Sequence, residues 1–370
     1  MHIAVALQDV IKSRDTTLYQ LCSSAGISYQ QGHDILRGKT KGINFDTLEK
    51  LCLYLNCSVD DLLIIKSSGD SILQRVLDDY PDTDSVKRVP GTHKDSAPKP
   101  FLQWVGGKRG MIEQYKNLLP KRFGEYFEPF FGGGALFFHL NPNIAHINDN
   151  NPELVIAYKA VRDNPENVID ILAELRRKHS KELYMRIRSL DRDYDLLGEL
   201  SSEEIAARMI YLNQTCFNGV YRVNQKGQFN VPIGSSLNRV ICDPFAIRNA
   251  SKALQKDEIT CLDFEEAVRG VSKGDFVYLD PPYFPISEYS DFTRYTKEKF
   301  YKQDQVRLMQ QFTELHNRGA YVMLSNSNAD FIKEIYSDFH IHPVSSGRLL
   351  NSRKEKRNKI TELVITSYKV

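Results

Sequence analysis

Short apolar runs alternate with helical patterns from residue 101 to the end of the chain, and this alternation limits the fold more than any other feature of the sequence. It is typical of a mostly parallel sheet with helices on its faces. Four apolar runs that each lead into polar or glycine-rich residues are candidate strands: 126–128, 145–147, 276–279 and 321–324. A closing antiparallel pair is expected at 339–344 and 362–368. Because ligands bind beyond the carboxyl ends of parallel strands, we expect a site at that edge.

Residues 165–251 interrupt this alternation with helical patterns and a loop rich in glycine and asparagine. We therefore expect a helical insertion within an α/β domain that spans residues 101–370. Residues 67–100 are rich in Ser, Asp, Pro and Gly, which is the composition of a linker, and only residues 72–77 show a helical pattern. The domain boundary is expected there, because 370 residues are enough for a second, smaller domain.

Residues 1–66 show helical patterns in close succession and almost no strand character, so we expect a small all-α domain. Thr17 can cap one helix, Gly26 breaks the pattern, and Ser28 can cap a second helix that extends to Arg37. This order is the helix-turn-helix layout. The second helix presents hydrogen-bonding side chains that suit base edges and phosphates. The expected DNA contacts are Gln30, Gln31 and Arg37.

The rest of this first domain strengthens the assignment. Residues 44–48 and 57–63 complete a pattern that resembles the Cro/repressor family of helix-turn-helix domains. The resemblance implies binding to DNA. A helical bundle that binds a protein, or nothing, is the alternative.

The bulk composition is that of an ordinary globular protein, with 41% hydrophobic and 26% charged residues. No apolar run approaches the roughly 20 residues that cross a bilayer, and the apolar N-terminal stretch is too short for a secretory signal. We expect a cytoplasmic protein without membrane contact. The six cysteines show no CxxC spacing, so neither a metal site nor a disulfide framework is expected.

A formal net charge of +2 means that a DNA-binding face has to come from local clustering. Residues 348–359 hold six basic side chains and one acid, Glu355. They are a candidate DNA-binding cluster. A solvated hairpin loop is the alternative for such a run of charge.

Residues 127–136 predict a strand, a glycine turn and then a helix, and glycines let a backbone approach a ligand closely. Phe137 stands where the third glycine of a dinucleotide-binding fingerprint would fall, and residues 106–109 lack the Ser or Thr of a phosphate-binding loop. Asp149 ends the next candidate strand, where its carboxylate can accept hydrogen bonds from ribose hydroxyls. The glycine turn and the acid together suggest an adenosyl ligand, with a tight turn that binds nothing as the alternative.

The apolar strand at 276–279 delivers Asp280, Pro281, Pro282 and Tyr283 to its carboxyl end. The amino nitrogen of adenine is a poor nucleophile because its lone pair is delocalised into the ring. Asp280 and the Pro281 carbonyl could accept hydrogen bonds from the two N–H groups of this nitrogen. Tyr283 could stack on a base that is flipped out of the duplex. Preorganised acceptors would then carry the rate without a covalent intermediate. A rigid turn after a core strand is the alternative for this motif alone.

Together with the opening segment 101–108, these motifs resemble the Dam-type adenine-N6 DNA methyltransferases, the alpha group of the D12 class, over nearly all of residues 101–370. The resemblance implies a Rossmann-like S-adenosylmethionine-dependent methyltransferase sheet with a helical target-recognition insertion. It implies S-adenosylmethionine as the cofactor, with Lys108 near its methionyl carboxylate and Asp263 and Phe264 flanking its adenine. The cofactor-binding residues that it implies are Trp104, Lys108, Phe131, Gly132, Gly134, Asp149, Asp263, Phe264 and Asp280.

Residues 217–222 and 227–232 resemble the DNA-reading hairpin of the same family. Phe217 would wedge between bases, while Asn218 and Arg222 would reach base edges. An aromatic wedge and an arginine suited to guanine are what a base-flipping reader needs. A surface hairpin without this role is the alternative.

Two departures from the relatives that methylate GATC limit the prediction of the DNA site. Gln103 stands where those relatives have lysine, and Ser235 and Ser236 stand where they have a basic and an aromatic residue. Gln103 is expected to contact DNA, and glutamine prefers adenine edges to guanine. A GATC-like site is therefore predicted, and the identity of its outer base pair is the part that the sequence determines least.

The sequence thus predicts a site-specific adenine-N6 methyltransferase that acts on double-stranded DNA and carries a regulatory DNA-binding domain. Two alternatives stay open: methylation of another amino group, on cytosine N4, RNA or a protein glutamine, and a helix-turn-helix repressor with an inert methyltransferase domain. A monomer or weak dimer is expected. The exact DNA site and a cognate restriction endonuclease as partner stay open. So does the choice between transcriptional regulation and added DNA affinity for the first domain.

Overall fold

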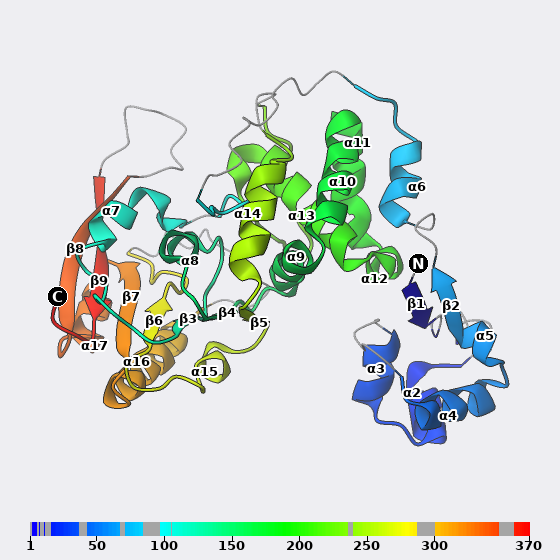
Figure 1. The fold of residues 1–370 in the computed structure, drawn as a ribbon, viewed down its shortest axis with the longest axis horizontal. Coiled ribbons are helices and arrows are strands. Elements are labelled where there is room, and N and C mark those ends of the chain that lie inside the picture. Colours follow the sequence, from blue (N-terminus) through cyan, green and yellow to red (C-terminus); the bar gives the residue numbers. More distant parts are fainter. Residues whose placement is uncertain are drawn as a thin grey trace. The chain divides into compact units, whose positions relative to one another are not determined.

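The computed structural model describes most of the chain in two compact units, residues 1–78 and 79–370 (Figure 1). The basic cluster predicted at 348–359 lies outside the described residues except for Lys359, and so does Ser236. Among the described residues, no helix is both long enough and apolar enough to span a membrane. The described residues are 2–5, 7, 11, 16–36, 43–66, 71–83, 97–104, 106–235, 240–286, 300–347 and 359–370.

The smaller unit is mainly helical and contains the predicted helix-turn-helix pair. Thr17 and Gln20 form a reciprocal capping box at the start of the first helix, and Gly26, with a φ of 64°, ends it. The Ser28 hydroxyl accepts a hydrogen bond from the backbone N–H of Gln31 at 3.1 Å, as expected for the residue that caps the second helix. The helices are α2 (Leu18–Ala25), α3 (Tyr29–Leu36), α4 (Phe45–Leu55), α5 (Val59–Leu62) and α6 (Ile72–Asp78).

The smaller unit also contains two strands, so the all-α expectation needs a correction. β1 (His2–Val5) pairs antiparallel with β2 (Leu63–Lys66), and His2 lies opposite Lys66. Each strand has only four residues, and its partner lies at the other end of the unit. Such pairing is decided by contacts between distant segments, which a local pattern does not reveal. The helical pattern at 72–77, within the segment of linker composition, is confirmed by α6.

The larger unit is built on a seven-stranded sheet with the order β5-β4-β3-β6-β7-β9-β8. The five strands from β5 to β7 are parallel, and β9 and β8 close the sheet in antiparallel orientation. The predicted strands and the closing pair are confirmed, whereas the sequence analysis missed β5. The strands are β3 (Tyr126–Glu128), β4 (Ala145–Asn148), β5 (Glu258–Thr260), β6 (Phe276–Leu279), β7 (Tyr321–Ser327), β8 (His340–Gly347) and β9 (Lys359–Thr366).

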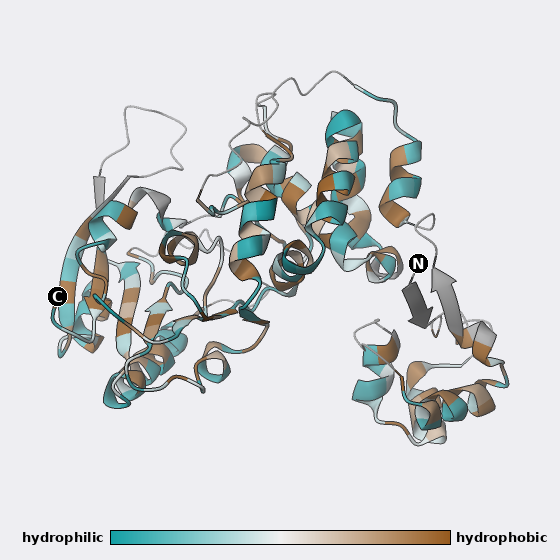
Figure 2. Cartoon of the chain, in the orientation of Figure 1, coloured by the Kyte–Doolittle hydropathy of each residue, from teal (hydrophilic) through white to brown (hydrophobic). Residues whose placement is uncertain are grey.

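Helices cover both faces of this sheet, and the chain between β4 and β5 is helical apart from the segment that contains residues 220–235. Figure 2 shows hydrophobic and hydrophilic residues alternating around the helices, as in α14. The helices are η1 (Lys108–Gly110), α7 (Ile112–Tyr115), α8 (Ala135–Leu140), α9 (Pro152–Asp163), α10 (Pro165–Arg177), α11 (Lys181–Ser189), η2 (Leu190–Arg192), α12 (Tyr194–Glu199), α13 (Ser202–Thr215), η3 (Phe217–Gly219), α14 (Pro244–Leu254), α15 (Phe264–Ala267), α16 (Lys302–Asn317) and α17 (Asp330–Ile335).

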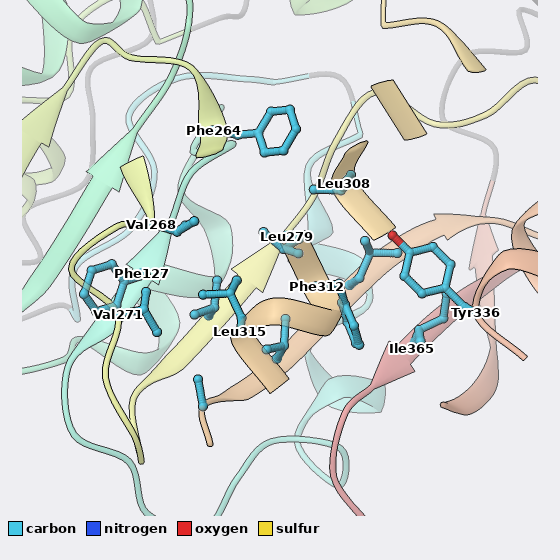
Figure 3. Close-up of a cluster of buried hydrophobic side chains, with 14 of the residues drawn as sticks. Phe127, Phe264, Val268, Val271, Leu279, Leu308, Phe312, Leu315, Tyr336 and Ile365 are labelled. Carbon is cyan, nitrogen blue, oxygen red and sulfur yellow. The ribbon is translucent and has the colours of Figure 1, made fainter. Parts of the chain in front are cut away.

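The hydrophobic core holds the end of β6 in place. Leu308 and Phe312 of α16 pack in one buried cluster with Leu279, the last residue of β6 (Figure 3). On the opposite face, Tyr278 contacts Tyr115 of α7, with ring centroids 6.3 Å apart. Because β6 is covered on both sides, all four of its residues are buried. The backbone of Asp280, which follows β6, is therefore held by a rigid strand.

A glycine determines how closely the two helices of the helix-turn-helix pair approach. Gly32 is in α3, and a Cβ added there would stand 2.3 Å from Cys22 Sγ on α2. We predict that Gly32→Ala destabilises this helix pair, because overpacking costs about 1–3 kcal/mol and alanine regains only about 0.5–1 kcal/mol over glycine in a helix. Amide hydrogen exchange of residues 18–36 in the full-length chain should become faster.

Cys22→Ala supplies the control for this prediction, since it removes the sulfur that the new methyl group would meet. The double variant Gly32→Ala/Cys22→Ala should exchange more slowly than Gly32→Ala alone. Equal exchange rates in the wild type and Gly32→Ala would contradict the packing argument.

Candidate active site and DNA-reading hairpin

The glycine turn between β3 and α8 is tied to Asp149, which follows β4. The backbone N–H of Gly132 donates to Asp149 Oδ2 at 2.9 Å, and that of Asn151 donates to Oδ1 at 2.9 Å. Gly132 and Gly134 have φ values of 48° and 61°, which residues with a side chain rarely adopt. Asp149 therefore helps to fix the shape of the turn.

Asp149 keeps part of its hydrogen-bonding capacity. Burial raises the pKa of its carboxyl group to about 6, although the backbone N–H groups of Gly132 and Asn151 act to lower it. A carboxylate offers about four acceptor positions, so the two bonds to the backbone leave others for a ligand. Because the residue is only partly buried, hydroxyl groups of a ribose can reach it.

Trp104 lies over the same turn. A Cβ on Gly132 would stand 2.7 Å from Trp104 Cδ1, and a Cβ on Gly133 would stand 3.0 Å from Trp104 Cβ. Glycine is thus needed to leave room for the tryptophan. Phe131 supports the turn from the core side, because it is 4% exposed and its Cζ would stand 2.5 Å from a Cβ on Gly134.

Asp263 and Phe264, at the start of α15, lie beside Arg307. Asp263 Oδ1 caps α15 by accepting the N–H of Glu265 at 3.0 Å, and it also lies 3.0 Å from Arg307 Nη2. The Arg307 guanidinium carbon lies 4.9 Å from the centre of the Phe264 ring, which is 5% exposed. No sequence pattern indicated Arg307 as part of this region.

Asn148 connects the glycine turn with the segment that leads to Asp263. Its amide nitrogen donates to the carbonyls of Pro129 and Leu262, each at 3.0 Å. Its Oδ1 accepts the N–H of Leu262 and the hydroxyl of Thr260, each at 2.8 Å. Asn148 is 3% exposed, and the sequence analysis missed it because no local pattern reveals bonds to such distant segments.

Asp280 follows β6 and forms an ion pair with Lys108. Lys108 Nζ lies 2.8 Å from Asp280 Oδ1, and the two side chains are 5% and 20% exposed. The same ammonium donates to the Gly106 carbonyl at 2.7 Å and lies 4.7 Å from the centre of the Tyr283 ring. The structure therefore brings together Asp280 and Tyr283, predicted for catalysis, and Lys108, predicted for cofactor binding.

A hydrogen-bond network supports the loop of residues 280–283. The Tyr283 hydroxyl donates to Glu362 Oε2 on β9 at 2.8 Å. Gln305 Nε2 donates to the Pro282 carbonyl at 2.9 Å, and Asn326 Nδ2 donates to Gln305 Oε1 at 3.0 Å. Glu362, Gln305 and Asn326 were not predicted, since they lie on other elements far along the chain.

Two charged neighbours act on Asp280 in opposite directions. Burial raises the pKa of Asp280, Lys108 lowers it, and Glu362 raises it, with a net shift upward. A buried carboxylate that is ionised can accept hydrogen bonds from an amino group. The loop therefore offers an acceptor whose charge depends on its lysine partner.

The predicted DNA-reading residues lie on one hairpin, and the three side chains are exposed. Phe217 is 50% exposed, and Asn218 has a φ of 57°, which asparagine tolerates better than most residues. Arg222 Nε donates to Asn230 Oδ1 at 2.8 Å across the hairpin. This bond orients the guanidinium and leaves its Nη groups for other partners.

Gln103 lies against the same hairpin although it is far away in sequence. Its backbone N–H donates to Asn213 Oδ1 at 2.8 Å. Asn213 Nδ2 donates in return to the carbonyls of Gln103 at 2.7 Å and Gly219 at 3.1 Å. Asn213 is fully buried, so it holds Gln103 at a fixed place beside the hairpin.

Gln30 and Gln31 lie on the exposed side of α3 in the smaller unit. Gln30 Nε2 donates to both carboxylate oxygens of Asp34, at 3.0 and 3.1 Å, and Gln31 Nε2 donates to the Thr47 hydroxyl at 3.2 Å. The side-chain oxygens of both glutamines remain acceptors. Arg37, the third residue predicted here, lies outside the described residues.

Comparison with known families matches both parts of the chain. Residues 104–348 match the model of the D12 class N6 adenine-specific DNA methyltransferases. Residues 6–68 match the model of the Cro/C1-type HTH DNA-binding domain.

Individual relatives agree with the methyltransferase match. A type II methyltransferase of Lactococcus lactis subsp. cremoris is 46% identical, covering 73% of this chain and 95% of the relative. A type II methyltransferase of Methanocaldococcus jannaschii is 40% identical, covering 73% and 99%. The DNA adenine methylase of Escherichia coli K12 is 29% identical, covering 71% and 93%. With the site geometry and the family match in agreement, this chain belongs to the D12 class N6 adenine-specific DNA methyltransferases, with a Cro/C1-type DNA-binding domain in front.

Proposed function

We propose that this adenine-specific DNA methyltransferase works at the edge of the sheet where β4, β3 and β6 end. One observation carries the proposal: these three strands are neighbours and parallel, so Asp149, the glycine turn and Asp280 follow them at the same edge. The methyl donor is S-adenosylmethionine, which supplies a methyl group on a positively charged sulfur. The acceptor is the N6 amino group of an adenine in duplex DNA.

Asp280 and the Pro281 carbonyl orient the adenine amino group in this proposal. Each oxygen accepts a hydrogen bond from one N–H group of the adenine amino group. The two hydrogen bonds hold the nitrogen lone pair towards the methyl group. Asp280 also stabilises the positive charge that develops on N6 during transfer. Tyr283 stacks on the flipped base, and its hydroxyl bond to Glu362 together with the Gln305 bond to Pro282 keeps the loop rigid.

The residues around the glycine turn fit the methyl donor. Asp149 has acceptor positions left for the ribose hydroxyls, and Gly132 lets the backbone approach closely. Trp104 borders the turn, Lys108 supplies a cation for the methionyl carboxylate, and Phe264 with Asp263 offers a surface for the adenine. In this proposal Phe131 and Gly134 shape the turn rather than contact the ligand through polar groups.

Gln103, Phe217, Asn218 and Arg222 read the DNA in this proposal. Phe217 fills the space that the flipped adenine leaves, and Asn218 and Arg222 contact base edges. The site is GATC-like, with an outer base pair that Gln103 reads in place of the lysine of GATC-methylating relatives. Glutamine binds adenine edges in a bidentate way, so an adenine in that outer pair is favoured.

The first domain acts as a separate DNA reader in this proposal. Gln30, Gln31 and Arg37 contact an operator, and a weak dimer places two such helices on two half-sites.

The protein works in the cytoplasm, where its DNA is. A cognate restriction endonuclease is the expected partner, because the relatives in Lactococcus and Methanocaldococcus are named type II methyltransferases.

We predict that Asp280→Ala abolishes methylation and leaves the dissociation constant of S-adenosylmethionine within about tenfold, because the lost acceptor serves the transition state more than the ground state. Single-turnover methylation and calorimetry measure the two quantities. Asp280→Asn keeps one acceptor oxygen without the charge and should retain more activity than Asp280→Ala. Undiminished turnover in Asp280→Ala would falsify the assignment.

Cofactor binding should depend on the ionisation of Asp149. Because burial raises the pKa of Asp149 to about 6, we predict that affinity for S-adenosylmethionine falls as the pH drops below about 6, where the protonated carboxyl loses acceptor positions. Asp149→Ala should weaken binding about tenfold or more, as expected for a lost hydrogen bond to a charged group. Asp149→Asn provides the control, because its binding should lack this acid-dependent step. A wild-type affinity that stays flat between pH 7 and pH 5 would remove Asp149 from the site.

Deletion of residues 1–78 should leave the methylated DNA sequence unchanged. The deletion ends at the boundary between the two units. It therefore keeps Thr83, whose backbone N–H donates to the Arg177 carbonyl at 2.8 Å within the larger unit. Sequencing of modified bases genome-wide compares the two proteins, and footprinting tests whether the full chain, but not the deleted one, protects an operator. A changed methylation motif after deletion, or no discrete footprint of the full chain, would overturn the separate role of the first domain.

A further inference from the structure

Tyr221 lies next to Arg222 in the hairpin, but its side chain is buried, with 6% exposed. Its ring stacks on Trp104, with ring centroids 5.3 Å apart and an interplanar angle of 20°. Its hydroxyl donates to Glu153 Oε2 at 2.9 Å. Tyr221 thus contacts two segments that do not belong to the hairpin.

Both contacts lead to the edge where the cofactor is expected. Trp104 lies over Gly132, where a Cβ in place of the glycine hydrogen would stand 2.7 Å from the tryptophan Cδ1. Glu153 is in the first turn of α9, and the residue that caps this helix, Asn151, donates its backbone N–H to Asp149. The ring of Tyr221 therefore reaches the glycine turn through one residue, and its hydroxyl reaches the Asp149 segment through another.

A buried ion network ties the hairpin to the same helix. Arg208 is 1% exposed and lies 3.1 Å from Glu153 Oε1 and 2.8 Å from Asp191 Oδ2. Asp191 Oδ2 also accepts the backbone N–H of Phe229 at 2.7 Å. Tyr221 on one side of the hairpin and Phe229 on the other are thus linked to the same arginine, one through Glu153 and the other through Asp191. Breaking a buried ion pair is costly, so a shift of the hairpin is resisted unless α9 moves with it.

We propose that Tyr221 is a positioning residue that couples cofactor binding at the glycine turn to DNA reading by Arg222. The proposal rests on the functions given above to the turn and to Arg222. A ligand that orders Trp104 and the segment of Asp149 also orders the two contacts of Tyr221, and thereby the backbone that carries Arg222. Since coupling between two sites is reciprocal, bound DNA tightens cofactor binding by the same factor.

The test measures this coupling factor directly. The dissociation constant of S-adenosylhomocysteine, the reaction product, is measured without and with a DNA duplex that contains the site that the enzyme methylates. The dissociation constant of this duplex is measured without and with S-adenosylhomocysteine. We expect a wild-type factor of about 5–150 from both measurements. Tyr221→Leu removes the ring and the hydroxyl, and it should lower the factor towards one. Tyr221→Phe keeps the stack on Trp104 and should lower it by less.

Tyr184→Phe is the matched control. Tyr184 is fully buried in α11, and its hydroxyl donates to the Val231 carbonyl in the second half of the hairpin at 2.9 Å. This variant removes one buried hydroxyl from the same hairpin, but on the side of α11 rather than at the glycine turn. Its coupling factor should equal that of the wild type.

Three results would overturn the proposal: a wild-type factor of one, an unchanged factor in Tyr221→Leu, or an equal loss in Tyr184→Phe. If Tyr221→Leu does not fold, an unchanged factor in Tyr221→Phe decides against it. Failure of the wild-type protein to bind either ligand would instead count against the proposed function, so the two failures can be told apart.

Discussion

The parallel pairing of β3 with both β4 and β6 is the constraint on which the site depends. Tyr126 lies opposite Ala145 on one side and Phe276 on the other. Because the three strands run in one direction, their carboxyl ends meet, and the glycine turn comes to lie between Asp149 and Asp280. The residues that these strands bury on both faces fix the register. A shift of β3 by one residue would turn Tyr126 to the other face and move the glycine turn relative to both acids.

The helical insertion is attached to this sheet by charge as well as by apolar packing. Arg208 of α13 is paired with Glu153 of α9 and with Asp191 of η2. A buried ion pair contributes little net stability, because desolvation offsets most of the attraction. It does penalise any arrangement that leaves the arginine without partners. The network therefore favours one placement of the insertion on α9. The helix α13 also packs against α9, and buried apolar residues of the two helices, such as Leu154 and Ala207, supply the apolar burial.

Sequence patterns predicted what depends on neighbours along the chain. The caps at Thr17 and Ser28, the strand ends and the loop of residues 280–283 follow from local rules of helix capping and apolar periodicity. The same rules could not reveal the pairing of β1 with β2, or β5, since short strands are selected by distant partners. Asn148, Arg307 and Glu362 were missed for the same reason: each acts through bonds to other segments, and nothing in the adjacent residues marks it.

The charge of Asp280 shows how such distant residues complete the site. Burial and Glu362 both raise the pKa of this carboxyl group and so favour its neutral form, whereas Lys108 lowers the pKa. A neutral carboxyl group would donate a hydrogen bond where an amino group needs an acceptor. Lys108 Nζ, at 2.8 Å from Oδ1, opposes that outcome and occupies one oxygen while it does so. In the function proposed above, the second oxygen is the one that accepts a hydrogen bond from the adenine amino group. In this arrangement Lys108, the last residue of the opening segment 101–108, favours the ionised form of an aspartate that lies far along the chain.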